Sequence, residues 1–532
     1  MSRPIFSPLF IRVLIESKRI TISGALFFTI FFLIALVACL KESKPDRNTL
    51  VIGLESSPAN LDPRYATDAN SYRLTQLLFN PLFKLDPHFN PVPDIVKRWD
   101  NPNETTYIFH LKKGVQFHDG SELTSKDVKY TFDTILNPSF KSPHMGAFEK
   151  IESIETLDKY TVRFILKEPF APFLINMAII GIVPKHAAEK SGDKFSNQPL
   201  GTGPFKLTGF LPDEKIILKA NTHYFEGQPR LNGIVFKIVP DSTVRLLELS
   251  QGGIHLLQND IPPDLFPFLE KRDNLKIVKE EGTTYSYLGF NLKDPVLKNI
   301  KVREAIAHAI DKEAIIRYIL KGSATSASGI LSPHNWAYEK NVKVFEYNKT
   351  KALRLLDEAG FKDPDGDGLD TRFKLTFKTS TDQLRKRIAE IIQQQLRGVG
   401  IGIDIMSYEW GTLYSDIKSG NFQMYSLSWV GIADPDMLYY IFHSSSIPPN
   451  GANRGGYVNQ SLDKLTGEGR VTLNISRRKK VYSEIQKILA EDIPYVSLWY
   501  TTNIAAMNKS VHGFVVYPAG DFISLRDVWM DD

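Results

Sequence analysis

The chain has 532 residues, more than one hydrophobic core usually organises, so two or more domains are expected. Its composition, 42% hydrophobic and 23% charged, is that of an ordinary soluble globular protein. The net charge of +5 is small and its basic residues are dispersed, which gives no support to nucleic-acid binding.

The N-terminus carries an uncharged apolar run, residues 20–39, after a short basic region. This order is typical of a secretory signal. The run ends in LVAC, residues 36–39, which resembles the bacterial lipobox, whose cysteine carries a diacylglyceryl chain. We therefore predict a lipoprotein signal peptide at 1–38, lipidation of Cys39 and a tether at 39–45. An uncleaved transmembrane anchor is the alternative.

Cys39 is the only cysteine, so neither a disulfide nor a thiol-based metal site is expected. Both interpretations of the N-terminus place the remaining chain outside the cytoplasmic membrane. Residues 1–38 hold four basic residues and one acid, and removing this net +3 lowers the net charge to +2. The charge balance therefore says little about a ligand.

The first half of the chain alternates predicted strands with predicted helices. Leucines at helical spacing in residues 71–80 predict a helix that stops before Pro81. Thr124 and Asp127 have the spacing of a capping box and predict the start of a second helix. The other predicted elements are strands at 49–54, 107–111, 160–170, 216–220 and 233–239, and a helix from Thr243 that ends at Gly252.

The stretch GTGPFKL, residues 201–207, is rich in glycine. It lacks both the GxGxxG spacing and the Lys-Ser/Thr ending of phosphate-binding loops. We interpret it as a tight backbone crossing between two lobes.

The second half shows the same alternation. Residues 300–310 carry an apolar helical stripe, and Asp311 is predicted to cap the following helix. The clearest helix is predicted from Gln383 and is ended by Gly398 or Gly400, and IGIDIM, residues 401–406, predicts a strand directly after it. Since helices and strands alternate in both halves, the predicted fold class is α/β.

Motifs for catalysis are missing: there is no GxSxG elbow, no Walker loop and no HExxH. We therefore expect neither an enzyme nor a cofactor. Asp363, Asp365, Asp367 and Gly368 match the opening of an EF-hand calcium loop, but its twelfth position is Lys374, where a bidentate Glu is needed. We interpret this segment as a solvated acidic turn, with weak cation binding as the alternative.

Aromatic residues are abundant, with 33 Phe, 21 Tyr and 6 Trp. Trp410, Trp429, Tyr285 and Tyr287 lie near predicted loops or in predicted strands. Aromatic side chains give a ligand contact area and shape at low entropic cost. These four residues are therefore candidates to line a ligand cleft.

Several motifs, in this order along the chain, resemble the extracellular solute-binding proteins of peptide and nickel ABC importers, family 5. They are NLDP at 60–63, YIFHLKKGVQFHDGSELTSKDVKYTFD, GTGPFKL, LGFNLKDPVLKNIKVREAIAHAIDKEAI, YNKTKALRLLDEAG with DPDGDG, QQQLRGVGIGID and WVGIADPD. The resemblance covers nearly the whole chain that follows the predicted signal.

This resemblance implies a two-lobed periplasmic-binding-protein fold of type II, with an extra subdomain on the first lobe. Hinge closure over the ligand would be its mechanism. The implied parts are lobe I at 46–75, 200–280 and 505–532, the extra subdomain at 76–199, and lobe II at 281–504.

The family also points to a site. In peptide-binding relatives an Asp between the Trp and the Asp-Pro pair holds the peptide's ammonium, but residues 430–433 contain no carboxylate here. Asp434 matches the Asp-Pro pair; we predict that it caps a helix with Pro435 at the first position, and a ligand contact is the alternative. Trp429 matches a cleft-lining Trp. The candidate ligand-binding residues are Trp429, Trp410, Tyr285, Tyr287, Asn291, Ser57, Asn60 and Asp434.

The function implied by the resemblance is that of a monomeric lipoprotein of the periplasm or outer cell envelope. It would bind di- or oligopeptides and deliver them to an ABC permease in the membrane. A nickel chelate, a sugar or an opine is the alternative ligand, and a sensor or chaperone with the same fold is the alternative role. A secreted hydrolase is disfavoured because no nucleophile–base motif occurs.

Overall fold

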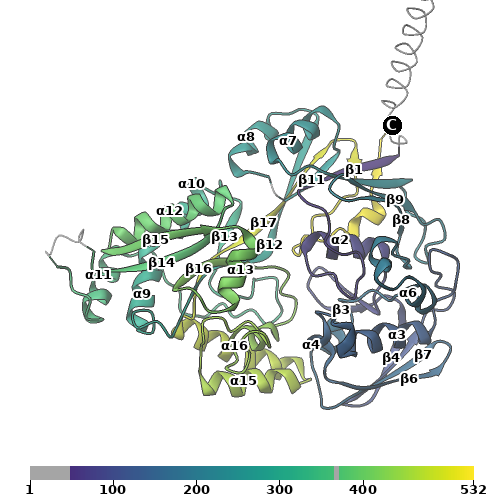
Figure 1. Cartoon of the computed structure of the whole chain (residues 1–532), viewed down its shortest axis with the longest axis horizontal. Coiled ribbons are helices and arrows are strands. Elements are labelled where there is room, and N and C mark those ends of the chain that lie inside the picture. Colours follow the sequence, from purple (N-terminus) through teal and green to yellow (C-terminus); the bar gives the residue numbers. More distant parts are fainter. Residues whose placement is uncertain (1–47, 260, 365–370, 532) are drawn as a thin grey trace, which may run out of the picture. The chain divides into compact units, whose positions relative to one another are not determined.

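The computed structural model describes residues 48–259, 261–364 and 371–531 (Figure 1). The predicted signal peptide, Cys39 and the tether lie outside these residues, as does most of the acidic turn. Thr49–Asp532 forms one compact unit. Within the described residues, no helix combines the length and the apolar character that crossing a membrane requires.

A mixed sheet of eleven strands organises this unit, in the order β15-β14-β16-β12-β17-β11-β1-β10-β9-β8, with β13 paired to β17. β1 is parallel to β10 and β11, and β14 is parallel to β15 and β16, whereas the central pairs are antiparallel. The strands are β1 Thr49–Leu54, β8 Phe205–Leu211, β9 Lys215–Ala220, β10 Gly233–Ile238, β11 Leu256–Gln258, β12 Leu275–Phe290, β13 Ala324–Ser326, β14 Phe373–Ser380, β15 Ile401–Tyr408, β16 Met424–Trp429 and β17 Tyr495–Asn508.

The two longest strands, β12 and β17, pair antiparallel along most of their length. β17 continues the sheet to β11, and β12 continues it to β16. Their register shifts between Glu280 and Thr284. Within this bulge a Cβ on Gly282 would stand 2.0 Å from the carbonyl oxygen of Thr501, so only glycine fits against the partner backbone.

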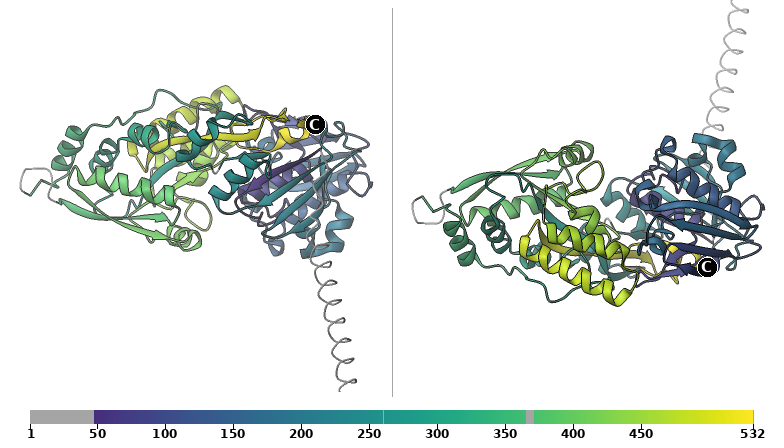
Figure 2. Two further views of the ribbon diagram at one scale, coloured as in Figure 1. Left: turned by 90° about the horizontal axis from the view of Figure 1, so that it is seen from above. Right: turned by 90° about the horizontal axis from the view of Figure 1, so that it is seen from below.

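Helices cover both faces of the sheet from β15 to β12 (Figure 1). On β12, Leu288 and Phe290 pack into one core with α9–α12, while Tyr285 and Tyr287 pack into another with α13–α16, as strand alternation requires. The yellow-green helices α15 and α16 lie together on one side in Figure 2. These helices are α9 Ile300–Ala309, α10 Lys312–Tyr318, α11 Lys349–Glu358, α12 Gln383–Arg397, α13 Trp410–Lys418, α14 Met437–Phe442, α15 Gln460–Val471 and α16 Ile475–Asp492.

The sheet around β1 is covered in the same way. Leu50 and Ile52 pack with α2, while Val51 between them packs on the other face with α7 and α8. The helices here are α2 Ala69–Leu78, α6 Lys185–Ser191, α7 Ser242–Gln251 and α8 Phe266–Glu270. The short strands β18 Val511–His512 and β19 Trp529–Met530 pair near the C-terminus.

Residues 82–182 contain a second sheet with a core of its own. Its antiparallel order is β4-β5-β7-β6, and Phe109, Phe132 and Phe164 lie in that core. The elements are β2 Phe83–Leu85, β3 Pro91–Pro93, β4 Val96–Asn103, β5 Thr106–Leu111, α3 Ser125–Leu136, α4 Met145–Phe148, β6 Ile151–Asp158, β7 Thr161–Leu166 and α5 Phe173–Asn176. This sheet falls within the segment predicted as an extra subdomain, whose boundaries stay a prediction.

Local sequence signals placed several elements correctly. The capping box is confirmed, since the carboxylate of Asp127 accepts the Thr124 N–H at 2.9 Å at the start of α3. The cap at Asp311 is confirmed as well, with the N–H of Ala314 donating to its carboxylate at 2.9 Å. α12 spans the predicted residues, and Leu384, Ile388, Ile391, Ile392 and Leu396 all pack into one core.

The predicted helix start at Asp434 needs correction. α14 begins three residues later, at Met437, so Pro435 does not occupy the first helical position. Asp434 still behaves as a capping side chain, because it accepts the N–H of Asp436 at 2.8 Å. This bond stabilises the turn that leads into α14. The predicted start was wrong because Asp434 and Asp436 both suit the position before a helix, and the helix follows Asp436.

The tight backbone crossing at GTGPFKL is confirmed at its glycines. A Cβ on Gly201 would lie 2.0 Å from the carbonyl oxygen of Leu78, and one on Gly203 would lie 2.3 Å from that of Leu77. The N–H of Gly203 instead donates to the Leu78 carbonyl at 2.9 Å. Side chains are excluded here because the loop packs directly on the end of α2; that it joins two lobes stays a prediction.

Candidate functional site

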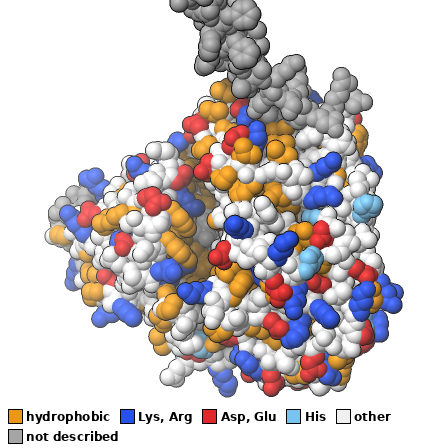
Figure 3. Space-filling view, turned by 45° about the vertical axis from the view of Figure 1, so that its right-hand side comes forward, with side chains coloured by type: hydrophobic (Ala, Val, Ile, Leu, Met, Phe, Trp, Pro, Cys, Tyr) orange, Lys and Arg blue, Asp and Glu red, His pale blue; other side chains and the backbone are white. Residues whose placement is uncertain are grey.

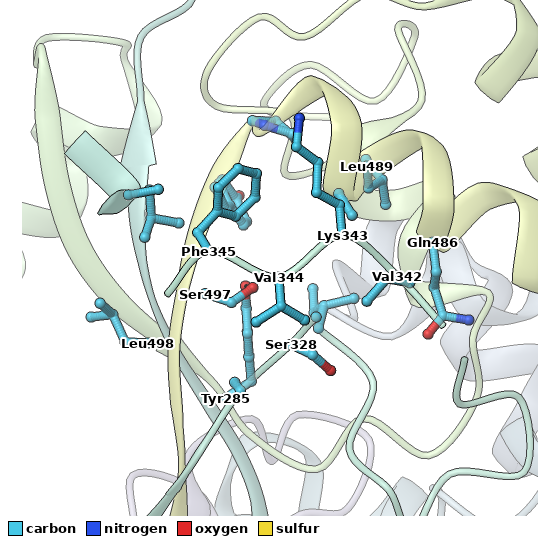
Figure 4. A pocket seen from close by; sticks show the side chains of 18 of the residues that line it. Tyr285, Ser328, Val342, Lys343, Val344, Phe345, Gln486, Leu489, Ser497 and Leu498 are labelled. Carbon is cyan, nitrogen blue, oxygen red and sulfur yellow. The ribbon is translucent and has the colours of Figure 1, made fainter. Parts of the chain in front are cut away.

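A small pocket lies between β12, β17 and α16 (Figure 4). Its volume of about 60 Å³ is room for a few water molecules, far less than a pocket for a ligand of drug size. The hydroxyl groups of Tyr285 and Ser497 form a 2.7 Å hydrogen bond in its wall. Burial lowers the pKa of Lys312, which also lines it and donates to the Ala327 carbonyl at 2.9 Å. We therefore look for the ligand site elsewhere.

Aromatic rings are stacked along β12, β16 and β17. Tyr287 lies between Trp429, with ring centroids 6.5 Å apart and planes 7° apart, and Tyr495, with centroids 4.0 Å apart. Trp429 is the last residue of β16 and pairs in register with Tyr285 on β12. Tyr285 and Tyr287 are fully buried, whereas Trp429 is half-buried. Trp429 is thus the outer ring of a stack fixed by three strands.

Exposed apolar side chains surround this outer ring. Tyr440 of α14 meets Trp429 edge to face, and Trp410 stacks on Tyr414 along α13. Val430, Trp410 and Tyr440 are 56%, 51% and 44% exposed, so apolar surface is open to solvent beside the stack. We call Trp410, Tyr414, Trp429, Val430 and Tyr440 the aromatic site. Figure 3 shows that the surface of the described chain is hollowed, with hydrophobic side chains along the edges.

One cation lies within the aromatic site. The guanidinium of Arg454 lies 5.0 Å from the ring centre of Trp429 and 5.3 Å from that of Tyr414. It donates to the hydroxyl groups of Tyr287 and Tyr414 at 3.3 and 3.4 Å. Among the described residues, no carboxylate forms an ion pair with Arg454. The indole N–H of Trp429 is also buried without a hydrogen-bond partner.

Two acids, Asp434 and Asp436, follow the aromatic site, and each carboxylate faces an arginine. Both terminal nitrogens of Arg478 donate to the carboxylate of Asp434, at 2.8 and 2.6 Å. The Nε of Arg470 lies 3.1 Å from Asp436. Burial raises the pKa of Asp436 to about 6, although the charge of Arg470 acts to lower it. With its oxygens occupied, Asp434 is omitted from the site that we propose below.

The remaining sequence candidates take part in local structure. Asn291 follows β12 and donates to the Phe422 carbonyl at 3.0 Å. Ser57 and Asn60 lie between β1 and α2: the Ser57 hydroxyl accepts the Asp213 N–H at 2.7 Å, and Asn60 accepts the N–H of a neighbouring residue at 2.8 Å. No contact in the described structure tests whether these three residues also bind a ligand.

The sequence analysis missed Arg454. It lies in NGANRGGY, a loop whose glycines signal a turn and no particular chemistry. Nor is there a candidate metal centre among the described residues, where no three His, Cys, Asp or Glu side chains gather. Of the acidic turn, only Asp363 lies within the described part of the chain.

Comparisons with known proteins agree with one another. The family model "Bacterial extracellular solute-binding proteins, family 5 Middle" matches residues 90–449. The chain is 33% identical to the oligopeptide-binding protein AppA of Bacillus subtilis over 501 residues, 90% of this chain and 91% of that one. It is 29% identical to the dipeptide-binding protein of Escherichia coli over 516 residues, 92% of this chain and 96% of that one.

Solved structures share the fold. AppA of Bacillus subtilis in complex with a nonapeptide matches with a TM-score of 0.80 over 91% of this chain and 99% of that one. NikZ of Campylobacter jejuni in complex with Ni(L-His) also gives 0.80, at 28% identity, over 91% of this chain and 100% of that one. The fold is therefore the two-lobed type II fold with its extra subdomain, as predicted.

Proposed function

Because the chain belongs to family 5 of the bacterial extracellular solute-binding proteins, we propose that it binds peptides between its two lobes and delivers them to the permease of an ABC importer. Named relatives support this ligand class: an oligopeptide-binding and a dipeptide-binding protein each align along nine tenths of the chain. The family is one of solute-binding proteins and not of enzymes.

The observation that carries the proposal is the aromatic site. Trp410 and Tyr440 expose large parts of their rings to solvent, and the half-buried Trp429 is held by the strands beneath it. Rigid, half-exposed rings give contact area to a ligand at low entropic cost, because few rotamers are lost on binding. Peptides of differing sequence share backbone and apolar surface, which such a site can accept.

Closure of the two lobes would complete the site. A ligand that contacts both lobes stabilises the closed state over the open one, and the permease then recognises the closed form. One contact already links the extra-subdomain segment to α15: the N–H of Ala171 donates to the carbonyl of Arg470 at 2.7 Å. The guanidinium of Arg470 also lies 5.2 Å from the ring centre of Phe170.

The mode of attachment is part of the same proposal. A lipid on Cys39 would keep the protein at the outer face of a membrane, close to its permease, as a monomer. Mass spectrometry of the protein purified from membranes tests this. A diacylglyceryl group on an N-terminal Cys39 is expected, and an intact N-terminal segment would support the uncleaved anchor instead.

A second candidate ligand is an amino-acid chelate of nickel. The fold matches NikZ, solved with Ni(L-His), as well as it matches the peptide complex of AppA, with a TM-score of 0.80 in both cases. Both kinds of ligand therefore belong in one binding experiment.

The test is a thermal-shift assay on residues 40–532, which contain the whole compact unit. A ligand present at 1,000 times its Kd stabilises the folded state by about 4 kcal/mol, so a micromolar binder is visible at millimolar concentration. We expect a randomised tetrapeptide pool to raise the Tm and Ni(L-His) to leave it unchanged. A shift with Ni(L-His) alone would overturn the peptide proposal.

A matched pair of variants places the site. Trp429→Ala is expected to abolish the peptide shift. Trp529→Ala is the control, because Trp529 is 36% exposed and stacks on His512, outside the aromatic site. Equal peptide shifts in both variants would show that the aromatic site does not bind the peptide.

A further inference from the structure

The guanidinium of Arg454 lies in the aromatic site, and no carboxylate of the described residues forms an ion pair with it. We infer that Arg454 receives a carboxylate of the bound peptide, so that the site binds the acidic group of its ligand and not the ammonium. The inference rests on the proposed function and specifies the polarity of the ligand at this site.

Two buried arginines have a carboxylate partner, which Arg454 lacks among the described residues. Arg64 bonds to the carboxylate of Asp62 at 2.7 Å. Arg478 makes two bonds to Asp434, at 2.8 and 2.6 Å. Each of these two guanidinium groups thus meets a carboxylate inside the protein.

Arg303, a third buried guanidinium, has no carboxylate but donates to four backbone carbonyl groups at 2.7 to 3.0 Å. The printed contacts of Arg454 are two phenol hydroxyl groups at 3.3 and 3.4 Å and two ring faces. These bonds are long for a charged donor, which prefers 2.7–2.9 Å to a carboxylate.

The surroundings of Arg454 favour binding of an anion to its guanidinium. Withdrawing a charge from water is costly unless an opposite charge or good hydrogen bonds replace the water, and ring faces return only part of that energy. The rings of Tyr414 and Trp429 also restrict the guanidinium, so little side-chain entropy remains to be lost on binding. Three of its five N–H donors have no recorded partner, enough for a bidentate bond to a carboxylate.

The surroundings contain donors and few acceptors. The buried indole N–H of Trp429 has no partner, so it is a second donor in want of an acceptor. Residues 430–433, directly after it, carry no acid, and the nearest acids in sequence, Asp434 and Asp436, are paired with Arg478 and Arg470. A ligand ammonium would meet the positive charge of Arg454 here, whereas a carboxylate would find in Arg454 a cation that no carboxylate of the described residues pairs with.

Four forms of one randomised tetrapeptide pool test the inference by calorimetry: free, N-acetylated, C-amidated and doubly blocked. We expect N-acetylation to leave the Kd within about twofold and C-amidation to weaken binding tenfold or more. If the loss on amidation is absent only in peptides that contain Asp or Glu, the recognised carboxylate is on a side chain. Equal affinity for all four forms would overturn the inference and leave the proposed function intact. Binding of none would refute the proposed function itself.

Variants assign the effect to the residue. Arg454→Gln is expected to lose the difference between free and amidated peptides, and Arg454→Lys to keep part of it. Arg354→Gln on α11 is the control with the same loss of charge, since the Arg354 side chain is 68% exposed and pairs with Glu358 on the same helix. Tenfold discrimination that persists in folded Arg454→Gln would show that another group binds the carboxylate. The wild-type comparison stands even if a variant fails to fold.

Discussion

Arg454 and Arg478 contact opposite ends of one short stretch, SWVGIADPD, residues 428–436, and they differ in whether they meet a carboxylate. Arg454 contacts the ring of Trp429 at the start of the stretch and meets no carboxylate of the described chain. Arg478 holds Asp434 near its end through two charge-assisted hydrogen bonds. The guanidinium charge of Arg478 is thus neutralised within the fold, whereas that of Arg454 is available to a ligand. A structural arginine thus differs from a ligand-binding arginine in the partners of its guanidinium.

The largest expected effect on stability comes from breaking the ion pair between Arg478 and Asp434. Arg478→Met should lower the free energy of unfolding by about 3–5 kcal/mol, because it leaves the buried carboxylate of Asp434 without its cation. Urea denaturation measures this. Adding Asp434→Leu should restore much of the loss, since removing both charges removes the stranded one. A loss below about 1 kcal/mol in the single variant would mean that the pair contributes no more than a surface ion pair.

The acid beside that pair should make the stability depend on pH. The folded-state pKa of Asp436, raised to about 6 mainly by burial, exceeds its ordinary value of 3.8, so folded protein keeps the proton over that interval. Wild-type stability should therefore fall as pH rises from 4 to 7, by about 3 kcal/mol from this group. Asp436→Asn lacks this slope, so the variant should gain on the wild type by that amount across the interval.

The exposed acid Asp100 is a control, because its contribution to stability should change with pH in the opposite direction. Hydrogen bonds from His110 and Arg98 lower the pKa of Asp100, so its contribution to stability is lost as pH falls. Asp100→Asn should therefore lose ground against the wild type as pH rises. Urea titrations at several pH values compare the two variants, and parallel curves for both would contradict the assigned pKa directions.

On the binding side, Arg454→Met should barely affect folding. Its guanidinium holds no internal carboxylate, so replacing it with an apolar chain of similar length strands no charge, and the free energy of unfolding should change by less than about 1 kcal/mol. Peptide affinity should nevertheless fall. If Arg454→Met unfolds the protein as readily as Arg478→Met does, the contrast between the two arginines is wrong.

The smallest effect is expected at the rim. Trp410 is 51% exposed and stacks on Tyr414, so Trp410→Ala should change the free energy of unfolding by less than about 0.5 kcal/mol. Calorimetry should show a several-fold loss of peptide affinity, because one ring face of the site is removed. Unchanged affinity would show that Trp410 does not contact the peptide.

Local chemistry made much of the fold predictable. The capping box at Thr124, the cap at Asp311 and the stripe of α12 each depend on residues within a few positions of one another. The family motifs then supplied the arrangement that periodicity cannot give. The start of α14 was misplaced because Asp434 and Asp436 both suit a turn, and only their bonds to other residues distinguish them.

The site was less predictable, because it depends on contacts distant in sequence. Tyr285 and Tyr287 were chosen as aromatic residues of one strand, yet both rings are fully buried while Trp429 reaches the surface. Arg454 joins them from a glycine-rich loop 167 residues beyond Tyr287. No spacing rule connects such a loop to the strand, so composition alone could not single it out.

The central strands also bear on how the protein is made. β1, Thr49–Leu54, lies in the sheet beside β11, and the other neighbour of β11 is β17, Tyr495–Asn508, which comes more than 200 residues after β11 in the sequence. Synthesis and export proceed from the N-terminus, so the early strands wait for almost the whole chain before their sheet is complete. Until then β11 exposes an unpaired edge on which other chains can pair. Helper proteins that delay collapse during export would therefore protect this chain most in the interval after β11 has been made and before β17 has been made.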